Sequence, residues 1–178
     1  MKEEIIIAGF GGQGVLSMGK ILAYAGLMNN LEVTWMPAYG PEQRGGTANV
    51  TVILSDKAIS SPVLDSFDTA VVLNQQSLDK FETKVNPGGT HLDDPNGIPH
   101  LPTRTDNTVK AVDAKGAAIE LKNSKTYNMI LLGALLAMRP VVNTEAVVKA
   151  LRKTLPERHH HLIPLNEQAI EKGRSLVQ

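Results

Sequence analysis

The feature that most constrains the fold is an apolar run followed at once by a glycine-rich turn. Residues 5–7 are three isoleucines, and they lead into AGFGGQGVLSMGK, residues 8–20. A short β-branched run bounded by glycine is typical of a strand buried on both faces of a sheet. Apolar residues then recur at helical spacing over residues 15–30. The segment therefore predicts a strand, a tight turn and a helix.

The rest of the chain alternates in the same way. We expect further strands at 32–36, 47–54, 69–73 and 108–112, with Pro37 ending the first of these. We expect further helices at 77–81, 114–121, 127–138, 144–155 and 165–176. Residues 85–106 are rich in Pro, Gly and Asp, so short strands and turns are expected there. This alternation predicts a three-layer α/β/α single domain, residues 1–178, with a largely parallel central sheet.

The composition limits the kinds of binding partner and the cellular compartment that we expect for this protein. Lys plus Arg number 18, and so do Asp plus Glu. The chain therefore lacks the basic excess that is typical of proteins that bind nucleic acid or an anionic membrane. The most apolar segment, 127–138, is shorter than the roughly 20 residues of a spanning helix. A strand-like run by the fifth residue argues against a signal peptide, so we expect a cytoplasmic protein. The chain has no cysteine, which excludes iron–sulfur ligation through thiolates.

Two phosphate-binding patterns overlap in the glycine turn, and neither is complete. A dinucleotide fingerprint needs an acidic residue near the end of the second strand, but Glu32 stands at its start. A P-loop needs Ser or Thr after Lys20, and Ile21 is there instead. A helix N-terminus behind a glycine turn can still receive an anion. The alternative is that the glycines only permit a tight turn and close packing.

A second glycine-rich loop, residues 39–47, follows the second strand. A doubly wound sheet places this loop at the same carboxyl-end edge as the first turn. Gln13 and Arg44 are the polar side chains that we expect to project from the two loops. Together the loops predict a crevice for an anion or a substrate.

Three blocks of sequence resemble the gamma subunit of 2-oxoacid:ferredoxin oxidoreductases. They are GFGGQGV at 9–15, YGPEQRGGTAN at 39–49 and VVLNQQSLDKF at 71–81, and the tail at 162–166 also fits. The resemblance implies a subunit of a complex that converts a 2-oxoacid, coenzyme A and oxidised ferredoxin into acyl-CoA, carbon dioxide and reduced ferredoxin. The stretch 45–49 is more similar to 2-oxoglutarate and branched-chain forms than to pyruvate forms, which favours 2-oxoglutarate.

The resemblance also implies how the cofactors are divided. Thiamine diphosphate, Mg²⁺ and iron–sulfur clusters would belong to partner subunits, and this chain alone would bind no cofactor and be inactive. Its partners would be the alpha and beta subunits, with a delta subunit as a further candidate, and ferredoxin through the complex. The chain would help to form the coenzyme A side of the active site, with no catalytic or metal-binding residue of its own. The residues expected there are Gly11, Gly12, Gln13, Gly14, Tyr39, Gly40, Arg44, Gly45 and Gly46.

Two other functions are compatible with these residues. The alternatives are an NAD(P)-binding Rossmann-type oxidoreductase and a non-enzymatic coenzyme A-binding regulator. Asp93 and Asp94 are expected to be solvated turn residues, and the histidines at 159–161 a surface loop. The helix at 127–138 is apolar nearly all round, which is typical of a helix buried in the core or against a partner. Because not all of it need be covered within one small domain, we expect the isolated chain to self-associate, for instance as a homodimer.

Overall fold

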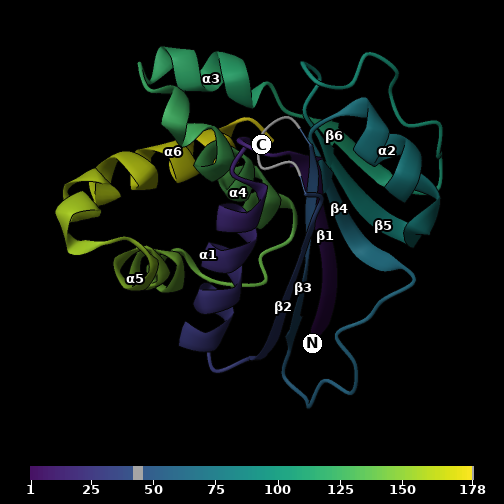
Figure 1. Ribbon diagram of the computed structural model, residues 1–178, viewed down its shortest axis with the longest axis horizontal. Helices are drawn as coiled ribbons and strands as arrows, with labels where there is room; N and C mark the ends of the chain where they lie inside the picture. Colours follow the sequence, from purple (N-terminus) through teal and green to yellow (C-terminus); the bar gives the residue numbers. More distant parts are fainter. Residues whose placement is uncertain (42–45, 178) are drawn as a thin grey trace.

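The computed structural model describes residues 1–41 and 46–177, and these contain one six-stranded sheet (Figure 1). The strands are β1 (Lys2–Phe10), β2 (Glu32–Tyr39), β3 (Thr47–Ser55), β4 (Phe67–Val72), β5 (Val85–Asp93) and β6 (Thr108–Ala111). Their order is β2-β3-β1-β4-β5-β6. β3 is antiparallel to β1 and β2, and the other three pairings are parallel. Only β3 is therefore reversed, which confirms the largely parallel sheet.

Helices cover both faces of this sheet. They are α1 (Val15–Met28), α2 (Gln75–Phe81), α3 (Ala114–Glu120), α4 (Tyr127–Met138), α5 (Thr144–Thr154) and α6 (Ile163–Ser175). Three 3₁₀ turns are η1 (Glu82–Lys84), η2 (Ser124–Thr126) and η3 (Glu157–Leu162). In Figure 1, α1, α4, α5 and α6 lie on one side of the sheet and α2 lies on the other. The predicted three-layer α/β/α architecture is confirmed, with unequal outer layers.

The isoleucine run forms the centre of both cores. Ile5 and Ile7 face the larger cluster, under α1, α4 and α6, whereas Ile6 faces the smaller cluster under α2. Successive side chains of a strand point to opposite faces, so a strand buried on both sides must be apolar at every position. This explains why β1 is a continuous apolar run rather than an alternating one.

Helix α4 is covered by the rest of the chain, which is one of its two predicted environments. All of its residues from Met129 to Leu136 are buried within the chain. α6 lies directly against it, because a Cβ atom at Gly133 would stand 2.0 Å from the carbonyl oxygen of Ile170. A close backbone approach of this kind needs glycine at the crossing point. The predicted burial of α4 in the core is therefore confirmed, and the expectation that it leaves an apolar surface for self-association is wrong.

Two local predictions are also wrong. Pro37 lies inside β2 and does not end it, since β2 is an edge strand, where a missing N–H is tolerated. Residues 85–93 form one nine-residue strand in place of short pieces. β5 pairs with β4 at Val85 and again from Thr90 to Asp93, where β6 pairs with its other side, and residues 86–89 lie at a register shift between these two stretches.

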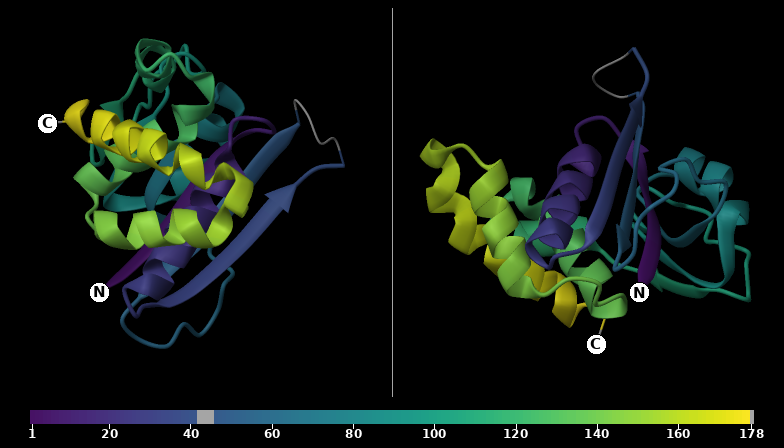
Figure 2. Two further views of the ribbon diagram at one scale, coloured as in Figure 1. Left: turned by 90° about the vertical axis from the view of Figure 1, so that its left-hand side faces the viewer. Right: turned by 90° about the horizontal axis from the view of Figure 1, so that it is seen from below.

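The hairpin of β2 and β3 stands beside the first glycine turn. Tyr39 of β2 pairs with Ala48 of β3, and Thr47 of β3 pairs with Phe10 at the end of β1. The distal ends of the hairpin project beyond the rest of the molecule (Figure 2). The two predicted loops therefore leave the sheet at the same edge.

Candidate functional site

The glycine turn between β1 and α1 depends on two left-handed residues. Gly12 has φ +97° and Gly14 has φ +76°, conformations that cost other residues energy. The N–H of Gln13 donates to the carbonyl of Phe10 at 3.2 Å, and its side-chain Oε1 accepts from the Phe10 N–H at 2.6 Å. The side chain of Gln13 is thus committed in part to holding the turn closed.

Helix α1 begins directly behind this turn with an open N-terminus. Its N-cap is Gly14, which supplies no side-chain acceptor, and the first helical turn contains no acidic residue. The first backbone N–H groups of a helix have no partner within the helix, and the helix dipole makes this end positive. Within the described residues, these groups have no side-chain cap. The N-terminus of α1 is therefore free to receive an acceptor or an anion.

The second loop meets the turn through the backbone. The N–H of Gly11 donates to the carbonyl of Gly46 at 2.8 Å. Tyr39 is 68% exposed at the end of β2. Gly40 has open space where a Cβ would stand and no positive φ, so neither crowding nor backbone conformation requires a glycine there. Arg44 and Gly45 lie outside the described residues.

A cavity of about 540 Å³ lies between the turn and the hairpin. Gly11, Gly12, Gly14 and the first turn of α1 line one side, and Tyr39 with residues 46–48 lines the other. We call it the hairpin cavity. It brings together five of the nine predicted site residues: Gly11, Gly12, Gly14, Tyr39 and Gly46. Its described side chains are apolar or neutral, among them Phe10, Leu16, Ser17 and Thr47.

Gln13, in contrast, lines a second cavity on the other side of the turn. This cavity has a volume of about 360 Å³ and contains Asp94, Lys115 and Tyr127. We call it the Asp94 cavity. Its residues come from α3, η2, α4 and the segment after β5, so they are far apart in sequence.

The prediction that Asp93 and Asp94 are solvated turn residues is wrong, because both are buried. Asp94 accepts the N–H and the side-chain Nδ2 of Asn96, each at 2.9 Å, and the hydroxyl of Tyr127. Asn96 also donates to Asp113 at 2.8 Å. Burial and this contact with the Asp94 carboxylate raise the pKa of Tyr127, so the phenol keeps its proton.

Asp93 has a different environment, because it faces the α2 side of the sheet. Neither of its carboxylate oxygens has a hydrogen-bond partner among the described residues, and the same is true of the ring nitrogens of His91. Burial, with a smaller contribution from Glu82, raises the pKa of Asp93 to about 7. Burial also lowers the pKa of His91. Burial thus shifts both groups toward their neutral forms.

The three histidines at 159–161 lie in η3, which is a 3₁₀ turn and not an irregular loop. Nε2 of His160 stands 2.9 Å from the carbonyl oxygen of Leu155. Across the described part of the chain, no three His, Cys, Asp or Glu side chains are placed to hold a metal ion. Nor is any helix there both long and apolar enough to cross a bilayer.

A family model described as pyruvate ferredoxin/flavodoxin oxidoreductase matches residues 4–176. The chain belongs to this family. The membership that the three sequence blocks predicted is thus confirmed over nearly the whole chain.

Two curated relatives within the family differ in length. The chain is 36% identical over 173 residues to the ketoisovalerate oxidoreductase subunit VorA of Methanothermobacter thermautotrophicus, covering 96% of this chain and 35% of that protein. It is 34% identical over 160 residues to the 2-oxoglutarate synthase subunit KorC of Methanocaldococcus jannaschii, covering 88% and 86%. The chain therefore spans about a third of the length of the first relative and most of the second.

Two solved structures resemble the fold closely. A keto/oxoacid ferredoxin oxidoreductase gamma subunit from Geobacter sulfurreducens is 29% identical, with a TM-score of 0.82 and 98% of both chains covered. A 2-oxoglutarate:ferredoxin oxidoreductase from Magnetococcus marinus, with 2-oxoglutarate, coenzyme A and succinyl-CoA bound, is 25% identical, with a TM-score of 0.88. The latter match covers 99% of this chain and 31% of that one. The fold thus occurs both as a separate gamma subunit and as part of a longer chain.

Proposed function

We propose that the chain is the gamma subunit of a cytoplasmic 2-oxoacid:ferredoxin oxidoreductase and forms the coenzyme A side of its active site. The Geobacter gamma subunit, similar along its whole length, supports the subunit assignment. The Magnetococcus enzyme, named with 2-oxoglutarate and coenzyme A, supports the substrate class. We favour 2-oxoglutarate as the oxoacid, although the VorA relative is named for ketoisovalerate.

The open N-terminus of α1 beside the hairpin cavity is the observation that carries the coenzyme A assignment. Coenzyme A has a diphosphate in its middle and, at one end, a long uncharged thiol arm that contains two amide groups. Free N–H groups at a helix N-terminus suit the diphosphate. A cavity of about 540 Å³ with apolar and neutral walls suits the arm. Gly11, Gly12 and Gly14 would let the ligand approach the backbone closely.

The loop after β2 would complete this site. Tyr39 and Gly46 line the hairpin cavity, and Arg44 stays a prediction from the sequence as a phosphate-binding group. Thiamine diphosphate, Mg²⁺ and the iron–sulfur clusters would be held by the alpha and beta subunits, with a delta subunit as a further partner. Electrons would pass to ferredoxin through those partners, because a chain without cysteine has no thiolate to hold a cluster.

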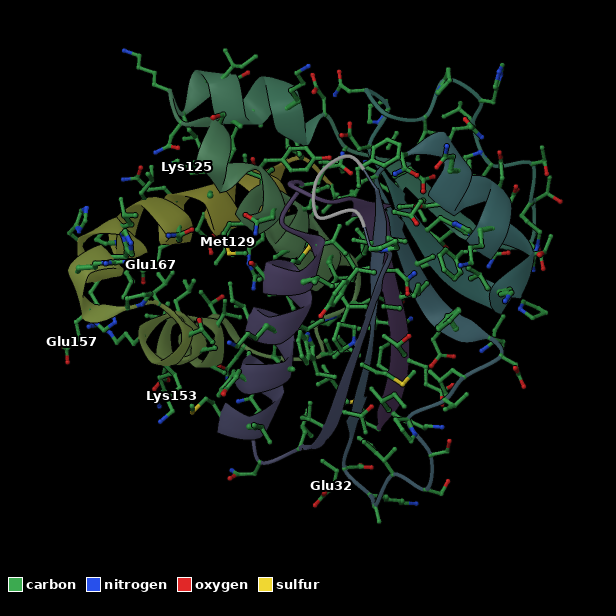
Figure 3. The ribbon with its side chains drawn as sticks, in the orientation of Figure 1. Glu32, Lys125, Met129, Lys153, Glu157 and Glu167 are labelled. Carbon is green, nitrogen blue, oxygen red and sulfur yellow. The ribbon has the colours of Figure 1, made fainter. Side chains whose placement is uncertain are left out.

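The sheet order argues against the NAD(P) alternative. In a dinucleotide-binding fold the second strand lies next to the first, so that its acidic residue reaches the ribose. Here β3 separates β2 from β1. Glu32 begins β2 and appears in Figure 3 at the bottom of the sheet, at the end opposite the glycine turn. No acidic residue of β2 is therefore placed for a ribose in this crevice.

Isolation of the chain from its native host with all associated proteins tests the subunit assignment. We expect partners that contain thiamine diphosphate and iron–sulfur clusters, and reduction of a viologen that depends on both 2-oxoacid and coenzyme A. The purified chain alone should show no such activity. Saturable binding of NADH would favour the dinucleotide alternative, and coenzyme A binding without those partners would favour a regulator.

A charge placed at the N-terminus of α1 tests the coenzyme A site. Ser17 is exposed in the first turn of α1 and lines the hairpin cavity. Ser17→Glu should weaken coenzyme A binding about tenfold, because the new carboxylate would compete with the diphosphate for the positive end of α1. An acidic side chain in the first turn is favourable for a helix, so the variant should remain folded. Ser60→Glu is the matched control, an exposed serine distant from both cavities. The measurement uses the complex assembled with its partner subunits, and equal affinity of the native and both variant complexes, measured by titration calorimetry, would contradict this site.

A further inference from the structure

The connection between β5 and β6 is an irregular segment, residues 95–107, which we call the strap. β5 and β6 are parallel, and parallel strands are usually joined by a crossover helix. All of the strap lies in the described part of the chain, where it contains no helix or strand, and Ile98 is its only buried residue. The strap lies on the same side of the sheet as α2 (Figure 1), and Ile98 joins the smaller core cluster there. It therefore covers the sheet in place of a helix, with little apolar contact.

Polar contacts hold the middle of the strap along α2. At the start of α2, Oε1 of Gln75 accepts the N–H of His100 at 3.1 Å. Beyond the other end of α2, Oε1 of Glu82 accepts the Thr103 N–H at 2.5 Å, the Thr103 hydroxyl at 3.0 Å and the Arg104 N–H at 3.1 Å. Most of these contacts are exposed, so water can replace them when the middle of the strap is released.

The two ends of the strap are held by separate contacts. Nδ2 of Asn96 donates to Asp94 at 2.9 Å and to Asp113 at 2.8 Å. At the other end, the N–H of Gly88 in β5 donates to the carbonyl of Asp106 at 2.9 Å. Release of the middle would leave both ends attached. The strap can therefore open locally while the sheet stays folded.

His91 and Asp93 lie under the strap, on the face of β5 that α2 covers. Both are 0% exposed, and within the described residues all four of their side-chain nitrogen and oxygen atoms lack a hydrogen-bond partner. Their neighbours in the sheet are uncharged residues of β4 and β6, namely Ala70, Val72, Val109 and Ala111. An unpaired charge is costly in such surroundings, so the buried pair is a carboxylic acid and a neutral imidazole. Burial raises the pKa of Asp93 to about 7 and lowers the pKa of His91, in agreement with this assignment.

The charged groups that face the pair come from the strap and from η1. Glu82 of η1 acts on both members of the pair, and Arg104 and Asp106 of the strap act on His91. Arg104 and Asp106 form an ion pair at 2.5 Å, so their charges largely cancel. The residues of α2 that reach the smaller core cluster are the uncharged Leu78 and Phe81. None of these groups gives the pair a hydrogen bond while the strap is closed.

We propose that the strap opens as a unit on the folded sheet, and that opening passes the proton of Asp93 to His91. In water, aspartate and histidine have ordinary pKa values of 3.8 and 6.5, so between these values the opened pair is a carboxylate and an imidazolium. An O–H bond of Asp93 breaks, its electron pair stays on the carboxylate, and water carries the proton to a ring nitrogen of His91. The pair holds one proton in both states, so opening exchanges none with the solvent and its equilibrium does not depend on pH. This inference concerns the fold and does not rest on the function proposed above.

Hydrogen exchange of the full chain, followed by NMR from about pH 5 to 6.5, tests the proposal. The amide protons of Thr103 and Arg104 report opening, because both bind Glu82 in the closed strap. The Leu73 N–H, which binds the Ala8 carbonyl within the sheet, reports unfolding of the core. In the native chain we expect the two strap amides to be at least about tenfold less protected than that of Leu73, at a level that does not change with pH.

Each single substitution in the pair should reveal the effect of the other member. With Asp93→Asn, His91 takes up a proton on opening, so opening should increase about tenfold for each unit by which the pH falls. With His91→Gln, Asp93 loses a proton on opening, so opening should increase about tenfold for each unit by which the pH rises. His100→Gln is the matched control, because it removes an exposed histidine of the strap and should leave opening independent of pH.

Glu82→Gln tests the attachment of the strap and keeps both members of the pair. Loss of the carboxylate charge should increase opening about tenfold at every pH in this range, because hydrogen bonds to a charged acceptor are the stronger ones. Unchanged opening in this variant would overturn the proposal, and so would strap amides that exchange only as fast as Leu73. Slopes of the same sign in Asp93→Asn and His91→Gln, or no slope in either, would show that no proton passes between them.

Discussion

Gly11 and Gly46 are joined through their backbones, with the Gly11 N–H donating to the Gly46 carbonyl at 2.8 Å. The two glycine-rich loops are thus held together by a contact that no side chain makes. The shape of the hairpin cavity depends on the backbone of the turn, and therefore on the residues that keep its left-handed conformation. Substitutions in the turn should act through backbone strain as well as through lost contacts.

Gly12→Ala should reduce the free energy of unfolding by about 1–2 kcal/mol, as expected for a non-glycine residue forced into the left-handed region. A Cβ at Gly12 would meet no atom within 4 Å, so the strain comes from φ +97° alone. Gly40→Ala is the matched control, because Gly40 has equally open space but no positive φ. It should be neutral or slightly stabilising. Urea denaturation of both variants measures the difference, and equal stability would contradict the role of φ.

Gly133→Ala should destabilise the chain by at least 2 kcal/mol. The added methyl group would meet the Ile170 carbonyl oxygen, which is backbone and cannot rotate away, so α4 and α6 must separate. Gly26 of α1 provides a control, since its Cβ would meet side-chain atoms of Leu54 and Val33 that can move. Gly26→Ala should cost less, and thermal unfolding of the two variants compares them. A cost at Gly133 no greater than at Gly26 would refute the close crossing.

Tyr127→Phe should destabilise the chain by about 1–3 kcal/mol, because Asp94 would lose one of its donors while it remains buried. Tyr39→Phe removes a phenol that is largely exposed and should change stability by less than about 0.5 kcal/mol. Chemical denaturation at neutral pH measures both effects. If the two variants proved equally stable, the Tyr127–Asp94 hydrogen bond would contribute nothing.

Asp93 should make stability depend on pH in an unusual direction. Its pKa in the folded chain is about 7, above the ordinary value of 3.8, so the folded state binds the proton more tightly than the unfolded state. Its contribution to stability is therefore complete below about pH 4 and is lost as the pH rises to about 7. Asp93→Asn removes this dependence. The variant should gain up to about 4 kcal/mol relative to the native chain between pH 4 and 8.

His91 affects the pH dependence of stability in the opposite direction, so its contribution must be distinguished from that of Asp93. Burial lowers its pKa in the folded state, so acid protonates the unfolded chain first and stability falls as the pH drops below about 6.5. The difference between the native chain and Asp93→Asn cancels the His91 contribution. Urea denaturation at steps of pH measures it, and a difference that does not vary with pH would show that Asp93 is ionised throughout.

Elements with a continuous or periodic apolar pattern could be predicted from the sequence. The helix at 127–138 has the predicted bounds, and α1 begins at Val15 as expected. The glycine turn was informative because its pattern requires a strand before it and a helix after it. The reversal of β3 could also have been predicted, since the loop at 40–46 is too short for the crossover that parallel strands need.

The Asp94 cavity could not be predicted, because its parts come together only in the folded chain. Tyr127 and Asp94 are 33 residues apart and share no local pattern. Pro87, Gly88 and Gly89 make the start of β5 resemble a turn, and they do lie at a register shift, whereas residues 90–93 pair with both β4 and β6. From the sequence alone, acidic residues that follow such a segment are expected to be solvated. In the folded chain, tertiary packing buries Asp93 and Asp94.

The contact between α4 and α6 has a consequence for the synthesis of the protein. The larger core contains both Ile5 of β1 and Ile170 of α6, so it cannot be complete until the ribosome has made α6. Domains generally fold as units while chains grow at about 5–20 residues per second. The apolar faces of β1 and α1 therefore remain partly uncovered until α6 has been made, and the nascent chain should depend on chaperones until then.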